Sequence, residues 1–241
     1  MDRVTVVTPE RAHWAFAAFF TGLAGYYLST LAVTALTADR FERLDVSSPP
    51  VLGPLLLLLF LPNVLLGAGP AMISRLRSHG PIADFGLKPT WRDVKVGLAC
   101  GGLSLLVAWI MAVLLLSVRR DTADTRSALE GIGLLSGGKS VWLAVAALFV
   151  FLGAPITEEL LTRGALWKAL EHYRVPRTTI LLLTALIFAF LHEESWRTLG
   201  LFAQGMAIGA ARMITGRTSS SMVAHATNNL LPAVYLYVGA S

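Results

Sequence analysis

Long stretches of the chain contain no aspartate, glutamate, lysine or arginine, among them residues 13–37, 51–69, 96–118 and 141–157. Runs of about 17–25 apolar residues are what a helix needs to cross the hydrocarbon core of a bilayer. The last third of the chain is also apolar, but single polar groups interrupt it at intervals. The pattern therefore predicts a helical protein that crosses a membrane several times.

The fold prediction is an all-α, polytopic transmembrane helical bundle of about seven (six to eight) spans, forming one integral membrane domain over residues 1–241. Pro54 and Pro62 predict a kinked or partly re-entrant second span, because proline removes an intrahelical hydrogen bond. The predicted spans cover approximately residues 13–37, 51–69, 95–118, 141–170, 178–192, 196–214 and 219–238.

Composition agrees with a membrane protein, since 55% of the residues are apolar and only 15% are charged, against about 25% charged in soluble domains. The first apolar run is longer than the core of a cleavable signal peptide, so we expect a retained first span. The single cysteine, Cys100, excludes an intrachain disulfide and a cysteine-based metal cluster.

Charge on the loops predicts how the bundle lies in the membrane. With a cytoplasmic N-terminus, 13 Lys and Arg residues would lie inside and 7 outside, although four basic residues in segment 119–140 oppose this orientation. The net charge of +5 is ascribed to loop arginines near anionic lipid headgroups, and no basic stretch with interleaved aromatic residues predicts nucleic-acid binding. We expect a bacterial plasma-membrane protein with its N-terminus in the cytoplasm.

Two carboxylates and an arginine interrupt the fourth apolar run in the sequence Glu158-Glu159-Leu-Leu-Thr-Arg163. On a helix, Glu159 and Arg163 are four residues apart and share a face, so they can form an ion pair. Glu158 is rotated by about 100° from Glu159 and points elsewhere. We predict that Arg163 neutralises Glu159 while Glu158 stays available as a proton acceptor. The alternative interpretation is an ordinary interfacial helix end.

Two more polar groups follow, Phe188-Ala-Phe-Leu-His192 and His225-Ala-Thr-Asn-Asn229. Residues four apart share a helical face, so Phe188 lies beside His192 and His225 beside Asn229. Polar side chains in an apolar helix need hydrogen-bond partners from other helices. As alternative interpretations, His192 could be a packing residue at a helix end. His225 and Asn229 could have the purely structural role of hydrogen-bonding one helix to another.

Taken together, these groups can hold one water molecule, with a carboxylate and an imidazole to activate it and His and Asn donors to bind an oxyanion. Glu158, His192 and His225 could instead bind a divalent metal, possibly zinc, and leave one position open for water. Both assignments indicate hydrolysis of an acyl or peptide bond.

The motifs E-E-x-x-x-R, F-x-x-x-H and H-x-x-x-N, in this order, resemble the CPBP family of intramembrane proteases. This is the family of the CAAX prenyl endopeptidases and of the bacteriocin-processing or immunity (Abi) membrane proteins. The specific match covers roughly residues 150–230. Gly164, Gly205 and Gly209 also resemble the family, and Gly205 and Gly209 further match the small-xxx-small pattern of close helix packing, as do Gly97 and Gly101.

The resemblance implies a CAAX-protease-like membrane endopeptidase, a hydrolase, whose catalytic core covers about residues 141–238. Glu158 and His192 would activate water, His225 and Asn229 would stabilise the oxyanion, and Glu159 with Arg163 would position the helix. The family is commonly described as metalloproteases, but a metal-free glutamate mechanism is also proposed for it. We favour the metal-free mechanism and keep the metal site as the alternative.

The implied partners are membrane lipids and a peptide or protein substrate, possibly lipidated or membrane-associated. Two other functions remain open, a non-catalytic immunity or scaffold protein and, with less support, an ion-coupled transporter. A bundle of simple antiparallel spans would place Glu158 and His192 at different depths. We therefore expect a long, tilted fourth span that runs on to Leu170 and an irregular, short fifth span.

Overall fold

The computed structural model describes residues 13–41, 53–118 and 140–238. The first part of the chain forms α1 (His13–Phe41), a 3-10 helix (Gly53–Phe60), α2 (Leu61–Arg77), the short α3 (Pro81–Phe85) and α4 (Trp91–Val118). The 3-10 segment precedes Pro62, which lies in the first turn of α2. The second span therefore begins as a 3-10 helix, and its helix continues beyond the predicted residue 69 to Arg77.

The second part begins with one continuous helix of 32 residues, Val141–His172. It consists of α6 (Val141–Leu148), a π-helical segment (Phe149–Gly153), α7 (Ala154–Glu159), a second π-helical segment (Leu160–Leu166) and α8 (Trp167–His172). We call it the α6–α8 helix. It is followed by α9 (Arg177–Leu191), a 3-10 turn (Ser195–Arg197), α10 (Thr198–Thr215) and α11 (Thr218–Val238). With α6–α8 taken as one, the described residues form eight α-helices and contain no strand.

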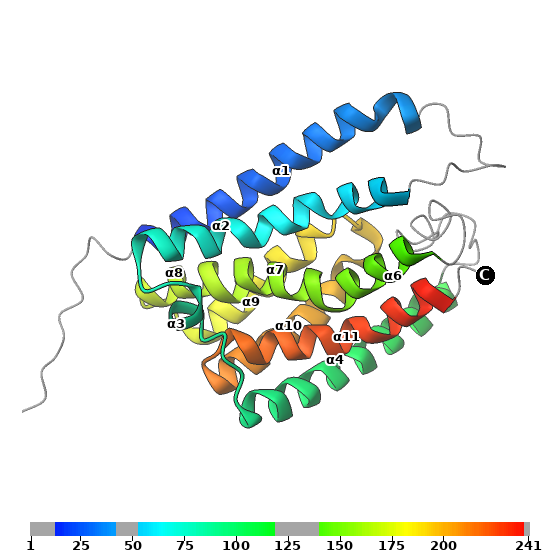
Figure 1. Cartoon of the computed structure of the whole chain (residues 1–241). Coiled ribbons are helices and arrows are strands. Elements are labelled where there is room, and N and C mark those ends of the chain that lie inside the picture. Colours follow the sequence, from blue (N-terminus) through cyan, green and yellow to red (C-terminus); the bar gives the residue numbers. More distant parts are fainter. Residues whose placement is uncertain (1–12, 42–52, 119–139, 239–241) are drawn as a thin grey trace, which may run out of the picture.

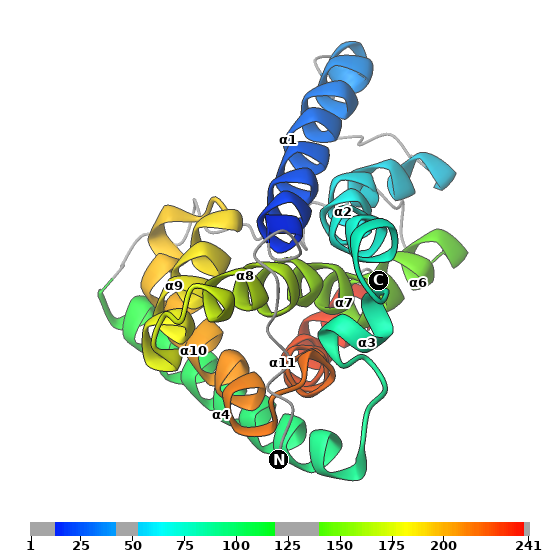
Figure 2. The same cartoon turned by 90° about the vertical axis from the view of Figure 1, so that its left-hand side faces the viewer.

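The α6–α8 helix runs through the middle of the molecule (Figures 1 and 2). The antiparallel pair α1 and α2 packs on one side of it. On the other side α11 packs against it, and α4 and α10 pack against α11 and against each other. α9 packs against α10, while α7 contacts both α2 and α11. The central helix thus carries its side chains into contact with both halves of the bundle.

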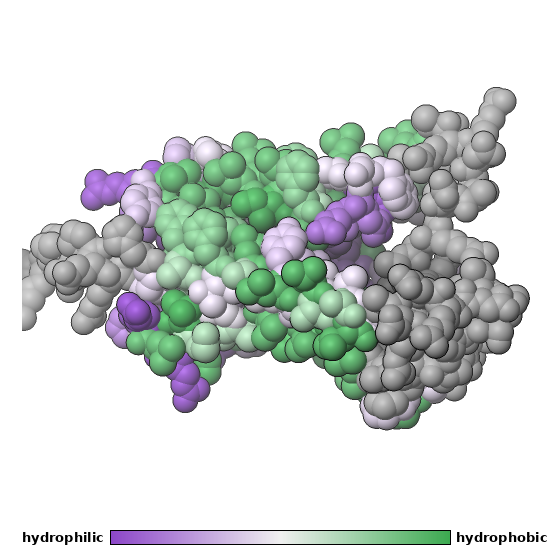
Figure 3. Space-filling view, turned by 90° about the horizontal axis from the view of Figure 1, so that it is seen from above, coloured by the Kyte–Doolittle hydropathy of each residue, from purple (hydrophilic) through white to green (hydrophobic). Residues whose placement is uncertain are grey.

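Four helices are long and apolar enough to cross a membrane: Trp14–Thr37, Leu57–Arg77, Trp91–Leu114 and Val141–His172. Large hydrophobic side chains are exposed along them, such as Leu28 and Trp109. Seen from the α1 and α2 side, the described surface is mostly hydrophobic, with hydrophilic residues at one end and in one group that interrupts it (Figure 3). These features identify an integral membrane protein. Each predicted span has a helix at matching residues, but three of these helices, α9, α10 and α11, are not among the four.

The long fourth span and the short fifth span resolve the predicted conflict of depth. Glu158 lies near the middle of the α6–α8 helix, which is about 48 Å long at 1.5 Å per residue. α9 starts beside the end of this helix and, with a length of about 22 Å, stops near mid-depth. His192 therefore follows α9 at the level of Glu158.

Candidate active site

Glu158 lies in α7, between the two π-helical segments of the central helix. π-helical turns widen the helix locally and occur frequently at functional sites. The Glu158 side chain is 14% exposed, and its two oxygens have different surroundings. Oε1 accepts a hydrogen bond from Asn63 Nδ2 of α2 at 3.3 Å. Oε2 is buried and has no hydrogen-bond partner.

Two imidazoles face this free oxygen. Glu158 Oε2 lies 4.0 Å from His192 Nε2 and 4.0 Å from His225 Nε2. A separation of 4.0 Å is too long for a direct hydrogen bond but suits a bridging water. The fold therefore brings Glu158, His192 and His225 together from three different helices, as the sequence predicted.

The other ring nitrogens show how each imidazole is held. His192 Nδ1 lies 2.8 Å from the carbonyl oxygen of Phe188. Because a carbonyl only accepts, Nδ1 carries the proton, and Nε2 of the neutral ring is then an acceptor. His225 Nδ1 lies 3.0 Å from Glu159 Oε1 and is held by that carboxylate in the same way. With Nδ1 engaged in this way, Nε2 of each imidazole is the ring nitrogen directed toward Glu158.

Arg163 makes the predicted ion pair with Glu159 and a further contact that the sequence did not indicate. Arg163 Nη1 donates to Glu159 Oε1 at 3.0 Å, and both side chains are completely buried. Arg163 Nη2 also donates to the carbonyl of Gly205 in α10 at 2.6 Å. The Arg163–Glu159–His225 chain therefore joins the central helix to α10 and α11.

The ring of Phe188 lies at the centre of these groups. Its centroid is 5.0 Å from the Arg163 guanidinium carbon, 4.6 Å from the His192 ring and 5.3 Å from the His225 ring. A Cβ atom on Gly205 would come within 3.0 Å of this phenyl ring. The small residue in α10 thus permits the close approach of α9, which confirms the predicted packing role.

Asn229 is on the same side of α11 as His225 but is already engaged. Its amide nitrogen donates to the carbonyl oxygen of Val150 at 3.0 Å, and its carbonyl oxygen accepts from Asn228 at 3.2 Å. Asn228 in turn accepts from Ser104 of α4 at 2.8 Å. An amide group has two N–H donors, so one donor of Asn229 is used by Val150.

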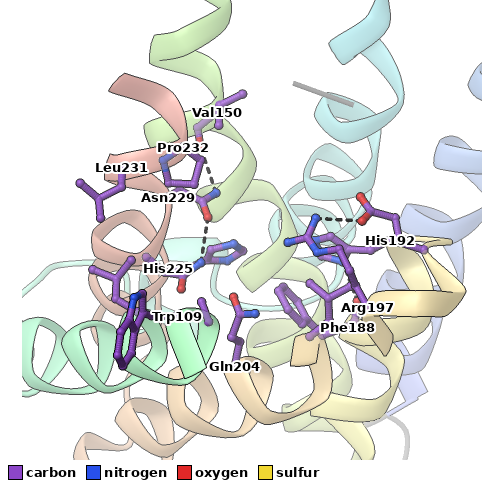
Figure 4. A pocket seen from close by; sticks show the side chains of 15 residues that line it. Trp109, Val150, Phe188, His192, Arg197, Gln204, His225, Asn229, Leu231 and Pro232 are labelled. Atoms are coloured by element: carbon purple, nitrogen blue, oxygen red, sulfur yellow. Dashed lines mark hydrogen bonds and ion pairs between the residues drawn. The ribbon is translucent and has the colours of Figure 1, made fainter. Parts of the chain in front are cut away.

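A cavity of about 430 Å³ opens in front of these residues (Figure 4). His192, His225 and Asn229 line it, while Glu158 lies behind the two imidazoles. Its rim includes an ion pair in which Arg197 Nη1 donates to Glu194 at 2.8 Å. The remaining lining residues are mostly apolar and come from five helical segments: Leu105, Ala108, Trp109, Val150, Phe188, Leu201, Gln204, Asn228, Leu231 and Pro232.

Several of these residues were not singled out from the sequence. Glu194 follows His192 by two positions and lines the cavity. Asn63 is the only amide in the uncharged run 51–69, and this polar interruption was the signal that could have identified it. Gln204 and Trp109 carry no such signal, because a glutamine near a helix start and a tryptophan in an apolar span are common.

The predicted metal ligands do not have the spacing of a metal site in this arrangement. Donor atoms around a tetrahedral zinc at 2.0–2.1 Å are separated by about 3.3 Å. The 4.0 Å separations at Glu158 are longer. Among the described residues, no group of three or more His, Cys, Asp or Glu could hold a metal ion. Binding of a metal by Glu158, His192 and His225 would require these side chains to move together.

Comparison with known proteins gave one family. Residues 140–231 match the family described as type II CAAX prenyl endopeptidase Rce1-like. No curated protein and no solved structure matched the chain. The matched segment contains all of the site residues predicted from the sequence: Glu158, Glu159, Arg163, His192, His225 and Asn229. Residues 140–231 therefore form a domain of the Rce1-like type II CAAX prenyl endopeptidase family.

Proposed function

We propose that this protein is an intramembrane endopeptidase that hydrolyses a peptide bond with a water molecule activated by Glu158 and His192. The observation that supports it best is the buried, unpartnered Oε2 of Glu158, which faces Nε2 of both His192 and His225 at 4.0 Å. Glu158 Oε2 and His192 Nε2 are two acceptors that converge on one point, which suits a water molecule with its two protons to donate.

The first step is the attack of this water on the substrate carbonyl. A water hydrogen-bonded at about 2.8 Å to both Glu158 and His192 spans the gap between them. As its oxygen forms a bond with the carbonyl carbon, one proton passes to Glu158 and the carbonyl oxygen becomes an oxyanion. His192 holds the water through Nε2, because its Nδ1 is engaged by Phe188.

Oxyanion stabilisation is assigned to His225 and the remaining amide proton of Asn229. His225 Nε2 can donate only when the ring is protonated. The ionised Glu159, at 3.0 Å from Nδ1, stabilises that imidazolium as the carboxylate of a catalytic triad does. Arg163 keeps Glu159 charged through the buried ion pair. When the intermediate collapses, the carbon–nitrogen bond breaks and the amine leaves with the proton held by Glu158.

The cavity walls support a substrate with an extended, largely apolar segment, such as a lipidated or membrane-associated peptide. Trp109, Leu231 and Pro232 provide apolar surface beside the reactive groups, and the Glu194–Arg197 pair is the charged feature of the rim. An apolar cavity with few polar groups is the usual form of a ligand site. Membrane lipids would surround the exposed hydrophobic faces of the bundle.

The orientation that we infer places the cavity toward the extracytoplasmic half of the membrane. α4, α9 and α11 begin, and α2, α8 and α10 end, at one end of the bundle (Figure 1). Basic residues gather there, which favours the cytoplasm: Arg75, Arg77, Lys88, Arg92, Lys95, Lys168, Arg174, Arg177, Arg212 and Arg217. Trp109 and Leu231 lie in the second halves of α4 and α11, away from that end.

Identification of new peptide termini tests the function. Membrane proteins from cells that express the wild-type chain or Glu158→Gln are compared by mass spectrometry, and a peptide spanning each new terminus is offered to the purified enzymes. We expect termini that depend on the wild type, and a rate loss of about 10²- to 10⁴-fold in Glu158→Gln and His192→Ala. Absence of such termini, or their persistence in both variants, would contradict the proposal and favour the non-catalytic scaffold.

The metal site remains a prediction that metal analysis decides. Stoichiometric zinc or another divalent metal in the purified wild type, with loss of that metal in His192→Ala and His225→Ala, would support a metal-bound form in which the three side chains have moved together. Full activity of the metal-depleted wild type would support activation of water by Glu158 and His192 alone.

A further inference from the structure

Asn63 is the described residue outside the matched family segment that hydrogen-bonds the Glu158 side chain. It lies near the start of α2, 95 positions before Glu158, and donates from Nδ2 to Oε1 at 3.3 Å. A carboxylate rotates about its last side-chain bond unless one of its oxygens is held. With Oε1 held by Asn63, the free Oε2 faces the two imidazoles.

A second observation shows that the position of α2 is set at this point. A Cβ atom on Gly67 would lie 2.7 Å from Thr157 Cα, so the two backbones are in direct contact beside Glu158. Gly67 is one helical turn after Asn63 and therefore shares its face of α2. Backbone atoms cannot rotate away, so the absence of a side chain at Gly67 determines how near α2 comes to the central helix.

We propose that Asn63 is a positioning residue for Glu158, and that the Gly67–Thr157 contact brings it within reach. The inference rests on the proposed function, in which Glu158 accepts the proton of the attacking water. Asn63 touches neither water nor substrate in this scheme. It fixes the plane of the carboxylate so that Oε2 is directed at the water site, and the N-terminal half of the chain thereby supports a site whose proposed reactive residues lie within 140–231.

Asn63→Leu removes the donor and keeps the approximate side-chain volume. We expect kcat for a substrate peptide to fall about tenfold, as is typical when a residue that orients a reactive group is lost, while KM stays within about twofold. Asn63→Gln, which keeps the amide donor, should recover part of the loss. The matched control is Val64→Ala, because Val64 is the next residue of the same helix and its side chain is exposed.

Gly67→Ala tests the contact that brings Asn63 into place. The added Cβ would collide with Thr157, so the helices must separate and kcat should fall as in Asn63→Leu. Gly102→Ala is the matched control, because nothing lies within 4 Å of a Cβ at that position.

An infrared measurement separates failure of this inference from failure of the proposed function. The carboxylate band of Glu158 is identified by its absence in Glu158→Gln, and we expect it to shift in Asn63→Leu but not in Val64→Ala. If the band shifts in Asn63→Leu but the wild-type chain has no hydrolytic activity, the contact between Asn63 and Glu158 is supported and the proposed function is contradicted. An unchanged band together with an unchanged kcat in Asn63→Leu would overturn the inference.

Discussion

Glu158 and Glu159 are neighbours in the chain with opposite environments. Glu159 is completely buried and its Oε1 is held by Arg163 and His225, whereas the Glu158 side chain is 14% exposed and its Oε2 faces two imidazoles at 4.0 Å. A buried charge that is paired and hydrogen-bonded supports the structure, and an unpaired carboxylate oxygen near a cavity is available for chemistry. At the scale of single residues, this difference separates a structural carboxylate from a reactive one.

Arg163→Met should strongly destabilise the protein, because it leaves the charge of Glu159 buried without a cation. Breaking a buried ion pair from one side costs about 3–5 kcal/mol. The measurement is the thermal unfolding midpoint of the purified protein in detergent. The double variant Arg163→Met with Glu159→Gln should recover part of the loss, since no uncompensated charge remains. An unfolding midpoint equal to that of the wild type in Arg163→Met would show that the pair contributes nothing to stability.

At the scale of helices, close packing of small residues sets the shape of the cavity. A Cβ atom on Gly101 of α4 would lie 2.5 Å from Thr227 Cβ and 2.6 Å from the carbonyl oxygen of Ala224, both in α11. This confirms the packing role predicted for the glycines of α4. Because α11 carries His225 and Asn229, the α4–α11 contact also fixes where these two side chains meet the central helix.

Gly101→Ala and Gly102→Ala form a matched pair that tests this contact. The first places a methyl group against the backbone of α11, and the second places it in open space. Overpacking costs about 1–3 kcal/mol, so we expect a lower unfolding midpoint and reduced hydrolysis only in Gly101→Ala. Equal behaviour of the two variants in both measurements would mean that the close approach of α4 and α11 is unimportant.

The whole molecule is asymmetric along the direction in which its helices run. Among the residues that the structure describes, ten lysines and arginines lie at the end where α4, α9 and α11 begin. Hydrophilic residues are visible at the same end in the surface view (Figure 3). This distribution is the basis for assigning that end to the cytoplasm and the cavity to the outer half of the membrane.

Reporter fusions test the orientation. α11 runs away from the basic end, so the C-terminus of the full chain should lie outside the cytoplasm. We expect a C-terminal alkaline phosphatase fusion to be active and a C-terminal green fluorescent protein fusion to be dark. As a control at the basic end, His79→Cys should react with an impermeant maleimide only after permeabilisation, since its side chain is exposed. A fluorescent fusion and an inactive phosphatase would reverse the orientation.

Local patterns in the sequence were enough to predict the class of fold, the positions of the helices and the pairing of Glu159 with Arg163. Helical periodicity and apolar run length are local properties, and the i, i+4 spacing sets that pair without reference to any other helix. The need for a long fourth span and a short fifth span also followed, because Glu158 and His192 had to reach one depth.

Only the tertiary structure decided which groups meet across helices. The contacts of His225 with Glu159 and of Asn63 with Glu158 join residues 66 and 95 positions apart. Their geometry depends on the rotation and height of each helix, which close packing at residues such as Gly67 and Gly101 sets. A local pattern shows which face of a helix a side chain occupies. Which partner that face meets is determined by packing between helices.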